Sequence, residues 1–427
     1  MNYAIKTGSS QSVSDFAPSD CALLSRLGLS ERVLATTSLT VLPDNAAVQS
    51  PDYSDLQITD YQNQWIEINP DSQFGSREDQ GDFGKFLASL FESLPQTILL
   101  TLPATLREEL GGENCDRILF DLGLVRLRDD LREAWLVYLR SDWLEDLSLL
   151  GSGSSERRVT MTSLGSNGRF ANQLFQYVFM RLYGLRHNCQ IETPHWIGRA
   201  LYGFDDPTCQ TGLKTIQYMP FVGSELGLWY SDNPPINVDF WGYFQVIPKA
   251  YRRHKKFIQR LLRPIATVSQ PIENWIKSEV GEGATTVGIH IRRGDYVKFG
   301  ETATYFQTIA VAAYRRSLAE LWPSLTKPRL IIATDAPELV AEFSDYQPLV
   351  VPAPLLSFDH WSFFPDFYAL CYCDNIFVVN SSFSRMASLL AKESTRAWII
   401  DIKEQKFIPY QAWDDVYFWD RFEEFPE

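Results

Sequence analysis

The sequence predicts an α/β fold with a pair of Rossmann-like lobes, preceded by an additional α/β domain. Its 427 residues, 45% of them hydrophobic, exceed one ordinary domain and can form more than one core. Strand-like apolar runs alternate with helical stretches in two successive parts of the chain, a pattern typical of parallel sheets covered by helices. We therefore expect an N-terminal domain at residues 1–150 and two lobes at residues 159–275 and 283–427.

The N-terminal domain has short predicted elements and no motif that identifies its chemistry. Residues 96–102 and 117–121 resemble strands, residues 104–111 a short helix, and residues 126–149 a longer helix. Residues 74–83 are expected to form a mobile loop rather than a phosphate-binding loop, because no Gly-Lys-Ser/Thr follows. We expect this domain to assist acceptor presentation or to bind a partner enzyme of the same pathway.

A linker is expected between this domain and the rest of the chain. Residues Gly151–Arg158 are small or polar and show no apolar periodicity. Because every motif discussed below lies after this segment, residues 159–427 are expected to bind their ligand when expressed alone.

The first lobe is predicted to open with a βαβ unit. Val159–Leu164 has the pattern of a strand and leads into the glycine-rich stretch Gly165–Phe170. A helix follows, and Cys189–Thr193 begins the next strand. The apolar face of the helix comprises Leu174, Phe175, Val178 and Leu182.

The second lobe has strands predicted at residues 286–292, 329–334 and 375–380. In the first of these, side chains alternate between the two faces, so His290 and Arg292 point the same way and Arg293 points the opposite way. Ligands of open α/β sheets bind outside the carboxyl ends of the strands. We therefore expect a ligand site where this strand ends.

The residues at this strand end favour an anionic ligand. Arg292 is an always-charged planar fork suited to a diphosphate, and His290 can hydrogen-bond a base or a sugar. For Arg293 and Asp295 an ion pair that only holds the turn is an equally good interpretation.

The segment His290–Tyr296 (HIRRGDY) resembles the donor-site motif of inverting α-1,2-fucosyltransferases, and more loosely that of the α-1,6- and protein O-fucosyltransferases. Three further segments agree in order and spacing. They are Gly168–Tyr177, Trp241–Gln245 and Asp374–Ser384. The resemblance implies the two-lobed GT-B architecture and transfer of L-fucose from GDP-fucose, with inversion, to a galactose-terminated glycan, most simply in α-1,2 linkage.

The resemblance also implies roles for the donor-site residues. Arg292 would bind the diphosphate, His290 the nucleotide, and Asp374 the guanine, although an ion pair or a helix-terminus role also fits Asp374. Asp335, at the end of another strand, would hold Arg293 or the ribose. No strand ends in Asp-x-Asp, so we expect transfer without a required metal or other cofactor, with Arg292 neutralising the leaving group.

The helix that begins after the strand at 375–380 is a second predicted donor contact. Backbone N–H groups at a helix start attract phosphate, and Ser381 and Ser382 can add hydroxyl donors, although helix capping alone explains one serine. Arg169, in the glycine-rich stretch, is assigned to the donor as well.

The acceptor side is expected to include Asn172, whose amide would orient the acceptor or a phosphate, or else only satisfy the loop backbone. Trp241, Tyr243 and Phe244 could stack on a sugar but more commonly pack in a core, and Gln245 is the better polar contact. Asp295 is available as a general base, although a turn role is favoured.

Two departures from the α-1,2 pattern leave other functions open. Ala171 stands where the related families have glycine, and Arg385 and Met386 stand where paired aromatic residues are usual. Fucosylation of a protein hydroxyl and non-catalytic binding of a GDP-sugar or glycan are the alternatives.

Composition limits the classes of partner that the protein is expected to bind and the cellular compartment in which it is expected. The net charge of −14 disfavours nucleic acid. Residues 251–263 form a basic segment that we interpret as an amphipathic helix with a solvated face, with peripheral membrane contact as the alternative. The six scattered cysteines fit reduced thiols, and the N-terminus lacks an apolar h-region. A cytoplasmic, bacterial enzyme of polysaccharide biosynthesis is expected.

Overall fold

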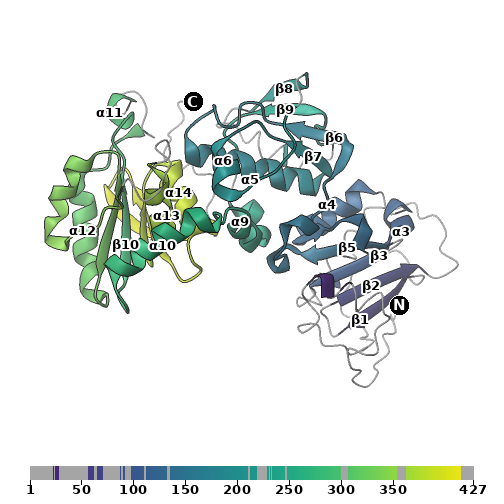
Figure 1. The fold of residues 1–427 in the computed structure, drawn as a ribbon, viewed down its shortest axis with the longest axis horizontal. Coiled ribbons are helices and arrows are strands. Elements are labelled where there is room, and N and C mark those ends of the chain that lie inside the picture. Colours follow the sequence, from purple (N-terminus) through teal and green to yellow (C-terminus); the bar gives the residue numbers. More distant parts are fainter. Residues whose placement is uncertain are drawn as a thin grey trace. The chain divides into compact units, whose positions relative to one another are not determined.

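A computed structural model gives the fold of the chain in two compact units (Figure 1). The first unit comprises residues 1–159, 181–191 and 253–260, and the second comprises residues 160–180, 192–252 and 261–427. The structure describes residues 23, 25–27, 56–61, 65–70, 87, 90–91, 98–109, 112–131, 135–209, 212–218, 228–229, 231, 233–245, 248–299, 306–352 and 362–414. The loop predicted at residues 74–83 lies outside these residues.

The first unit contains a mixed five-stranded sheet in the order β1-β2-β3-β5-β4. Strands β2 and β3 are parallel, and the other neighbours are antiparallel. The strands are β1 (Leu56–Tyr61), β2 (Trp65–Pro70), β3 (Leu99–Pro103), β4 (Leu124–Arg126) and β5 (Trp135–Arg140). Helices α3 (Ala104–Glu109) and α4 (Glu113–Asp121) follow β3, and their apolar side chains share one core with the sheet.

Two elements predicted in this unit are wrong. Residues 117–121 belong to helix α4, in which Cys115 and Leu119 lie four residues apart and both pack in the core. Residues 126–149 are not helical, because they contain strand β5 and short 3-10 turns. The run at residues 117–121 and the apolar part of β5, Trp135–Leu139, are both short, and periodicity does not separate a buried strand from a buried helix in such a run.

The predicted linker is also shorter than expected. Strand β6 occupies Ser154–Thr160, which leaves only residues 151–153 of the proposed linker outside it. The sequence did not indicate this strand, because its first five residues are polar and exposed or only partly buried, and only Val159 and Thr160 are buried.

The first unit includes two segments that follow residue 160 in the chain, residues 181–191 and 253–260. The fully buried ring of His254 has Nδ1 3.0 Å from the Ser141 hydroxyl and Nε2 3.0 Å from the Phe120 carbonyl oxygen. Arg260 donates to the Leu144 carbonyl at 2.7 Å, and Arg186 pairs with Asp121 at 2.7 Å. Buried polar groups from two later segments are therefore satisfied by the N-terminal residues.

The first lobe contains a four-stranded sheet in the order β7-β6-β9-β8, in which β8 and β9 are parallel. Its elements include α5 (Phe170–Arg186), β7 (Cys189–Glu192), α6 (Ile197–Tyr202), β8 (Lys214–Gln217) and β9 (Val238–Trp241). The βαβ unit predicted at the start of this lobe is formed by β6, α5 and β7, and the predicted apolar face of α5 is buried. Its first strand ends at Thr160, however, and residues 162–166 of the strand predicted at Val159–Leu164 and its continuation form turns.

The second lobe is a five-stranded sheet in the order β11-β10-β12-β13-β14, of which the first four strands are parallel. The strands are β10 (Thr286–Ile291), β11 (Arg329–Thr334), β12 (Asn375–Val378), β13 (Arg396–Asp401) and β14 (Lys406–Tyr410). Numbered by their order along the chain, the four parallel strands lie in the sheet as second (β11), first (β10), third (β12) and fourth (β13). The topological switch point therefore lies between β10 and β12.

Helices cover both faces of this sheet, as Figure 1 shows for α12 on one side of β10 and α10 and α13 on the other. These are α10 (Ala266–Val280), α12 (Val311–Leu321) and α13 (Phe364–Tyr372), and α14 (Ser382–Leu390) follows β12. Every residue of β10 is buried, as a central parallel strand requires. The predicted fold class, α/β with paired Rossmann-like lobes and an additional α/β domain, is confirmed.

The basic segment at residues 251–263 differs from its prediction as one amphipathic helix. It comprises the end of α8 (Pro248–Tyr251), a 3-10 turn at Arg252–His254, and α9 (Lys255–Leu261). The apolar side chains of Phe257, Ile258 and Leu261 are buried in the protein. They are not available for the membrane contact that was the alternative interpretation.

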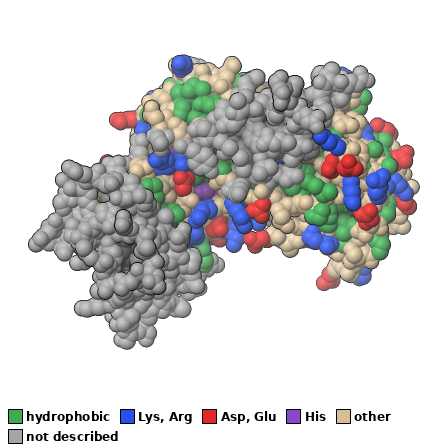
Figure 2. Space-filling view, turned by 180° about the vertical axis from the view of Figure 1, so that it is seen from behind, with side chains coloured by type: hydrophobic (Ala, Val, Ile, Leu, Met, Phe, Trp, Pro, Cys, Tyr) green, Lys and Arg blue, Asp and Glu red, His purple; other side chains and the backbone are tan. Residues whose placement is uncertain are grey.

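The described surface carries both signs of charge. On the face shown in Figure 2, basic and acidic side chains are interspersed rather than gathered by sign. No helix among the described residues is long and apolar enough to cross a bilayer. The cysteines that the structure describes are free thiols, namely Cys115, Cys189, Cys209, Cys371 and Cys373.

Candidate active site

A pocket of about 610 Å³ lies at the switch point of the second lobe, within the second unit. Its walls come from both lobes, including residues that follow β10, β11 and β12 and residues at the start of α5. The lining comprises Gly168, Arg169, Ala171, Asn172, Trp241, Tyr243, Gln245, His290, Arg292, Asp295, Tyr296, Phe306, Ala333, Thr334, Asp335, Ser362, Phe363, Asp366, Ser381, Ser382 and Phe383. Most of the predicted site residues are therefore brought together.

Arg292 is the central cation of the pocket. Its guanidinium contacts the carboxylates of both Asp295 and Asp335 and lies 5.5 Å from the centre of the Tyr296 ring. Asp295 also pairs with the exposed guanidinium of Arg169 at 3.3 Å. Two carboxylates thus hold Arg292 in place, and an entering anion would compete with them for its N–H donors.

The predicted ion pair between Arg293 and Asp295 is wrong, because Asp295 pairs with Arg292 and Arg169. The Arg293 guanidinium instead donates to the carbonyls of Arg292, at 3.0 Å, and Ile309, at 2.7 Å. Asp335 does hold Arg293, but the contact is a hydrogen bond of 2.7 Å from the Arg293 backbone N–H to the Asp335 carboxylate. A Cβ at Gly294 would come within 2.6 Å of the Asp335 carboxylate, so the turn requires glycine.

His290 is a buried, neutral imidazole in the pocket wall. Its side chain packs against the Phe383 ring with centroids 4.9 Å apart, and the residue is only 5% exposed. Burial lowers the pKa of His290 to about 4, although the negative charge of Asp335 acts in the opposite direction and raises it. Within the part of the chain that the structure describes, Nδ1 has no hydrogen-bond partner. A ligand that reached this buried nitrogen would not have to break an existing hydrogen bond to bind it.

The start of α14 lies at the pocket as predicted. Ser381 is the N-cap, and its hydroxyl accepts from the Phe383 N–H at 3.4 Å. Ser381 and Ser382 both line the pocket, whereas Ser384 turns inward and accepts from the Val379 N–H at 3.1 Å. Two serines and the first turn of a nine-residue helix are thus placed to bind an anion.

On the opposite wall, Asn172 is oriented by Gln245. The Gln245 amide donates to the Asn172 carbonyl oxygen at 2.7 Å, which fixes the Asn172 Nδ2 group as a donor. A Cβ at Gly168 would lie 2.7 Å from that Nδ2, so glycine is needed here. Trp241 and Tyr243 line the pocket, whereas Phe244 is buried and stacks on Phe179 at 4.1 Å.

The guanine-binding role predicted for Asp374 is wrong. Asp374 precedes β12 and accepts from the Thr286 N–H at 2.9 Å and the Thr286 hydroxyl at 2.8 Å, with Lys392 at 3.6 Å. Thr286 is the first residue of β10. Because the pocket lies at the carboxyl ends of these parallel strands, Asp374 is at the opposite edge of the sheet.

Asp366 is the pocket carboxylate that the sequence did not reveal. It lies in the first turn of α13, and burial raises its pKa to about 7, although a hydrogen bond from the Thr334 backbone opposes the shift. A proline followed by an acidic residue is an ordinary helix start, which gave the segment no distinguishing signal. The aromatic residues around it, such as Phe364 and Phe367, are ones that more commonly pack in a core, as both do here.

Among the residues that the structure describes, no group of three or more His, Cys, Asp or Glu side chains is arranged to hold a metal ion. The pocket's own positive charge comes from Arg292 and Arg169.

Comparison with known proteins gives only distant structural likenesses. No family model and no curated protein matches the sequence. The chain is similar to the fucosyltransferase NodZ from Bradyrhizobium, with 16% identity, a TM-score of 0.42, and coverage of 58% of this chain and 96% of that one. It is also similar to POFUT1 in complex with GDP-fucose, with 14% identity, a TM-score of 0.29, and coverage of 57% and 73%.

Proposed function

We propose that the chain is an inverting fucosyltransferase that uses GDP-fucose as donor. The observation that carries the proposal is the convergence of Arg292, the neutral His290 and the start of α14 on one pocket at the switch point of the second lobe. These are the groups that a nucleoside diphosphate requires, namely a guanidinium and helix N–H donors for the phosphates and a polar ring for the nucleoside.

The diphosphate would occupy the space between Arg292 and the N-terminus of α14. One phosphate would displace Asp295 or Asp335 from part of the guanidinium, and Ser381 and Ser382 would donate from the other side. As the bond between the fucosyl carbon and the phosphate oxygen breaks, the electron pair stays on the phosphate. Arg292 then neutralises the growing charge, so no metal is part of the proposal.

The guanine would be recognised by His290 and Asp366. Guanine presents two neighbouring N–H donors, and the Asp366 carboxylate is half-buried with no cation paired to it among the described residues. In its ionised form it can accept both donors, and His290 Nδ1 adds a further contact to the nucleoside. Asp366 thereby replaces Asp374 in the role first assigned from sequence.

The acceptor would approach from the wall formed by Asn172, Trp241 and Tyr243. Its hydroxyl attacks the fucosyl carbon from the face opposite the diphosphate, which inverts the configuration, and loses its proton as the new bond forms. Asp295 is the carboxylate available to take that proton. Its oxygens are occupied by ion pairs with Arg169 and Arg292, so we propose that proton transfer contributes little.

The acceptor class and linkage are proposed from the motif resemblance alone: a galactose-terminated glycan and an α-1,2 bond. The test is incubation with GDP-fucose and a panel of β-galactosides, with the product mass and linkage read by mass spectrometry and NMR. A product fucosylated at O2 of galactose is expected. GDP-mannose serves as the donor control, and preferential use of a different sugar nucleotide would overturn the donor assignment.

A further inference from the structure

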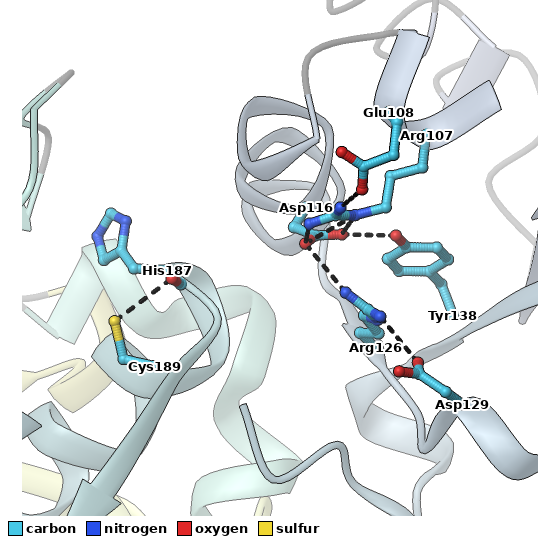
Figure 3. A network of polar contacts seen from close by, with 8 residues as sticks. All are labelled: Arg107, Glu108, Asp116, Arg126, Asp129, Tyr138, His187 and Cys189. Atoms are coloured by element: carbon cyan, nitrogen blue, oxygen red, sulfur yellow. Dashed lines mark hydrogen bonds and ion pairs between the residues drawn. The ribbon is translucent and has the colours of Figure 1, made fainter. Parts of the chain in front are cut away.

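The first unit contains a second charged cluster, built around the buried carboxylate of Asp116 (Figure 3). Asp116 accepts from Arg107 Nη2 at 2.5 Å and from the Tyr138 hydroxyl at 2.5 Å, and Arg126 Nη1 lies at 3.5 Å. Arg107 also pairs with Glu108, and Arg126 with Asp129 at 2.8 Å. The cluster joins α3, α4, β4 and β5.

Positive charge is in excess in the buried part of this cluster. The side chains of Arg107 and Arg126 are 8% and 20% exposed, whereas Asp116, at 4%, is the single carboxylate buried beside them. Glu108 and Asp129 are 70% and 69% exposed, and exposed ion pairs contribute little. Burial opposes the charge on Arg107, but the hydrogen bond and charge of Asp116 raise its pKa, so it stays protonated.

These guanidiniums face a pocket of about 410 Å³, a size that suits a small molecule. Arg107 and Arg126 line it together with Trp135, Thr105 and the two exposed carboxylates. An indole offers a flat apolar surface for a sugar ring, and paired guanidiniums bind carboxylate or phosphate through parallel hydrogen bonds. Glu108 and Asp129 can rotate into solvent when another anion arrives, because most of their surface is already exposed.

We propose that this pocket binds a sugar that carries an anionic group, either a phosphate or a carboxylate. The anion contacts Arg107 and Arg126 in place of Glu108 and Asp129, and the ring lies against Trp135. The site is independent of the donor pocket, since all of its residues belong to the first unit. With this site, the first unit would bind an anionic sugar separately from the donor nucleotide.

Calorimetric titration of the full chain tests this proposal, with glucose 1-phosphate, glucuronate, inorganic phosphate and neutral glucose as probes. We expect saturable binding of at least one anionic sugar and none of glucose, and the stronger of the two sugars identifies the anion. Arg126→Gln should weaken binding by about tenfold or more, since it removes a charge-assisted contact. The double variant Glu108→Gln, Asp129→Asn should tighten it, because the competing carboxylates are removed.

Arg128→Gln is the matched control. Arg128 is in the same unit and pairs with exposed Asp130 at 3.1 Å, but it does not line this pocket, so its loss should change affinity less than about twofold. The double variant keeps the test decisive even if Arg126→Gln fails to fold, because both of its positions are exposed. No saturable binding of either anionic sugar by the wild type and the double variant would overturn the proposal, as would binding that Arg126→Gln leaves unchanged.

Discussion

Arg292 is the residue on which the donor site depends most. Arg292→Ala should lower turnover by about 10²-fold or more, because one charge aimed at a developing anion is worth several kcal/mol. Steady-state kinetics with GDP-fucose measures the loss. Arg315→Ala is the control, since Arg315 pairs with Asp345 on the surface of the same unit, and it should leave turnover unchanged. Near-normal turnover in a well-folded Arg292→Ala variant would remove the site assignment.

Asp366 should make GDP binding depend on pH. Its pKa of about 7 means that the free protein carries a largely protonated carboxyl below pH 7 and an ionised one above it. Only the ionised form accepts both guanine N–H donors, so GDP affinity should rise as pH increases from 6 to 8. Titration of GDP at several pH values measures this. Asp366→Asn should bind GDP weakly and without that rise; an unchanged pH profile in this variant would show that Asp366 does not contact the base.

At the scale of the element, Asp374 ties the first residues of β10 and β12 together. Asp374→Ala removes the acceptor for the Thr286 N–H and hydroxyl, so the free energy of unfolding should fall by about 1–2 kcal/mol. GDP affinity should not change, because this residue is at the edge of the sheet opposite the pocket. Denaturant unfolding and GDP titration are the measurements. If Asp374→Ala lost GDP affinity but kept its stability, the guanine-binding role predicted for Asp374 from the sequence would be restored.

Elements with a long or distinctive pattern could be predicted from sequence, and the rest could not. Strand β10 was evident because its buried run ends in a turn glycine and charged residues, and this also placed His290 and Arg292 correctly. Helix α4 and strand β5 were misassigned because a short apolar run fits either structure. Asp366 could not be found, because its environment depends on the packing of α13 against other elements.

At the scale of the whole molecule, the first unit includes later segments of the chain, which reverses an expectation from sequence. Residues 159–427 expressed alone would leave His254 without Ser141 and Phe120, and Arg260 without the Leu144 carbonyl. The fragment would also expose to water the surface that these residues cover, including the His254 ring, which is 1% exposed in the full chain. We therefore expect this fragment to be insoluble or to melt well below the full chain in a thermal unfolding assay. A soluble fragment with normal GDP affinity would show that these contacts are dispensable.

The central claim is that the pocket at the ends of β10 and β12 binds the guanine nucleotide of the donor. A crystal structure of the full chain grown with saturating GDP tests it most directly. We expect the diphosphate against Arg292 and the first turn of α14, and the guanine beside His290 and Asp366. GDP bound at any other place, or protein that crystallises without nucleotide despite saturating GDP, would contradict the account.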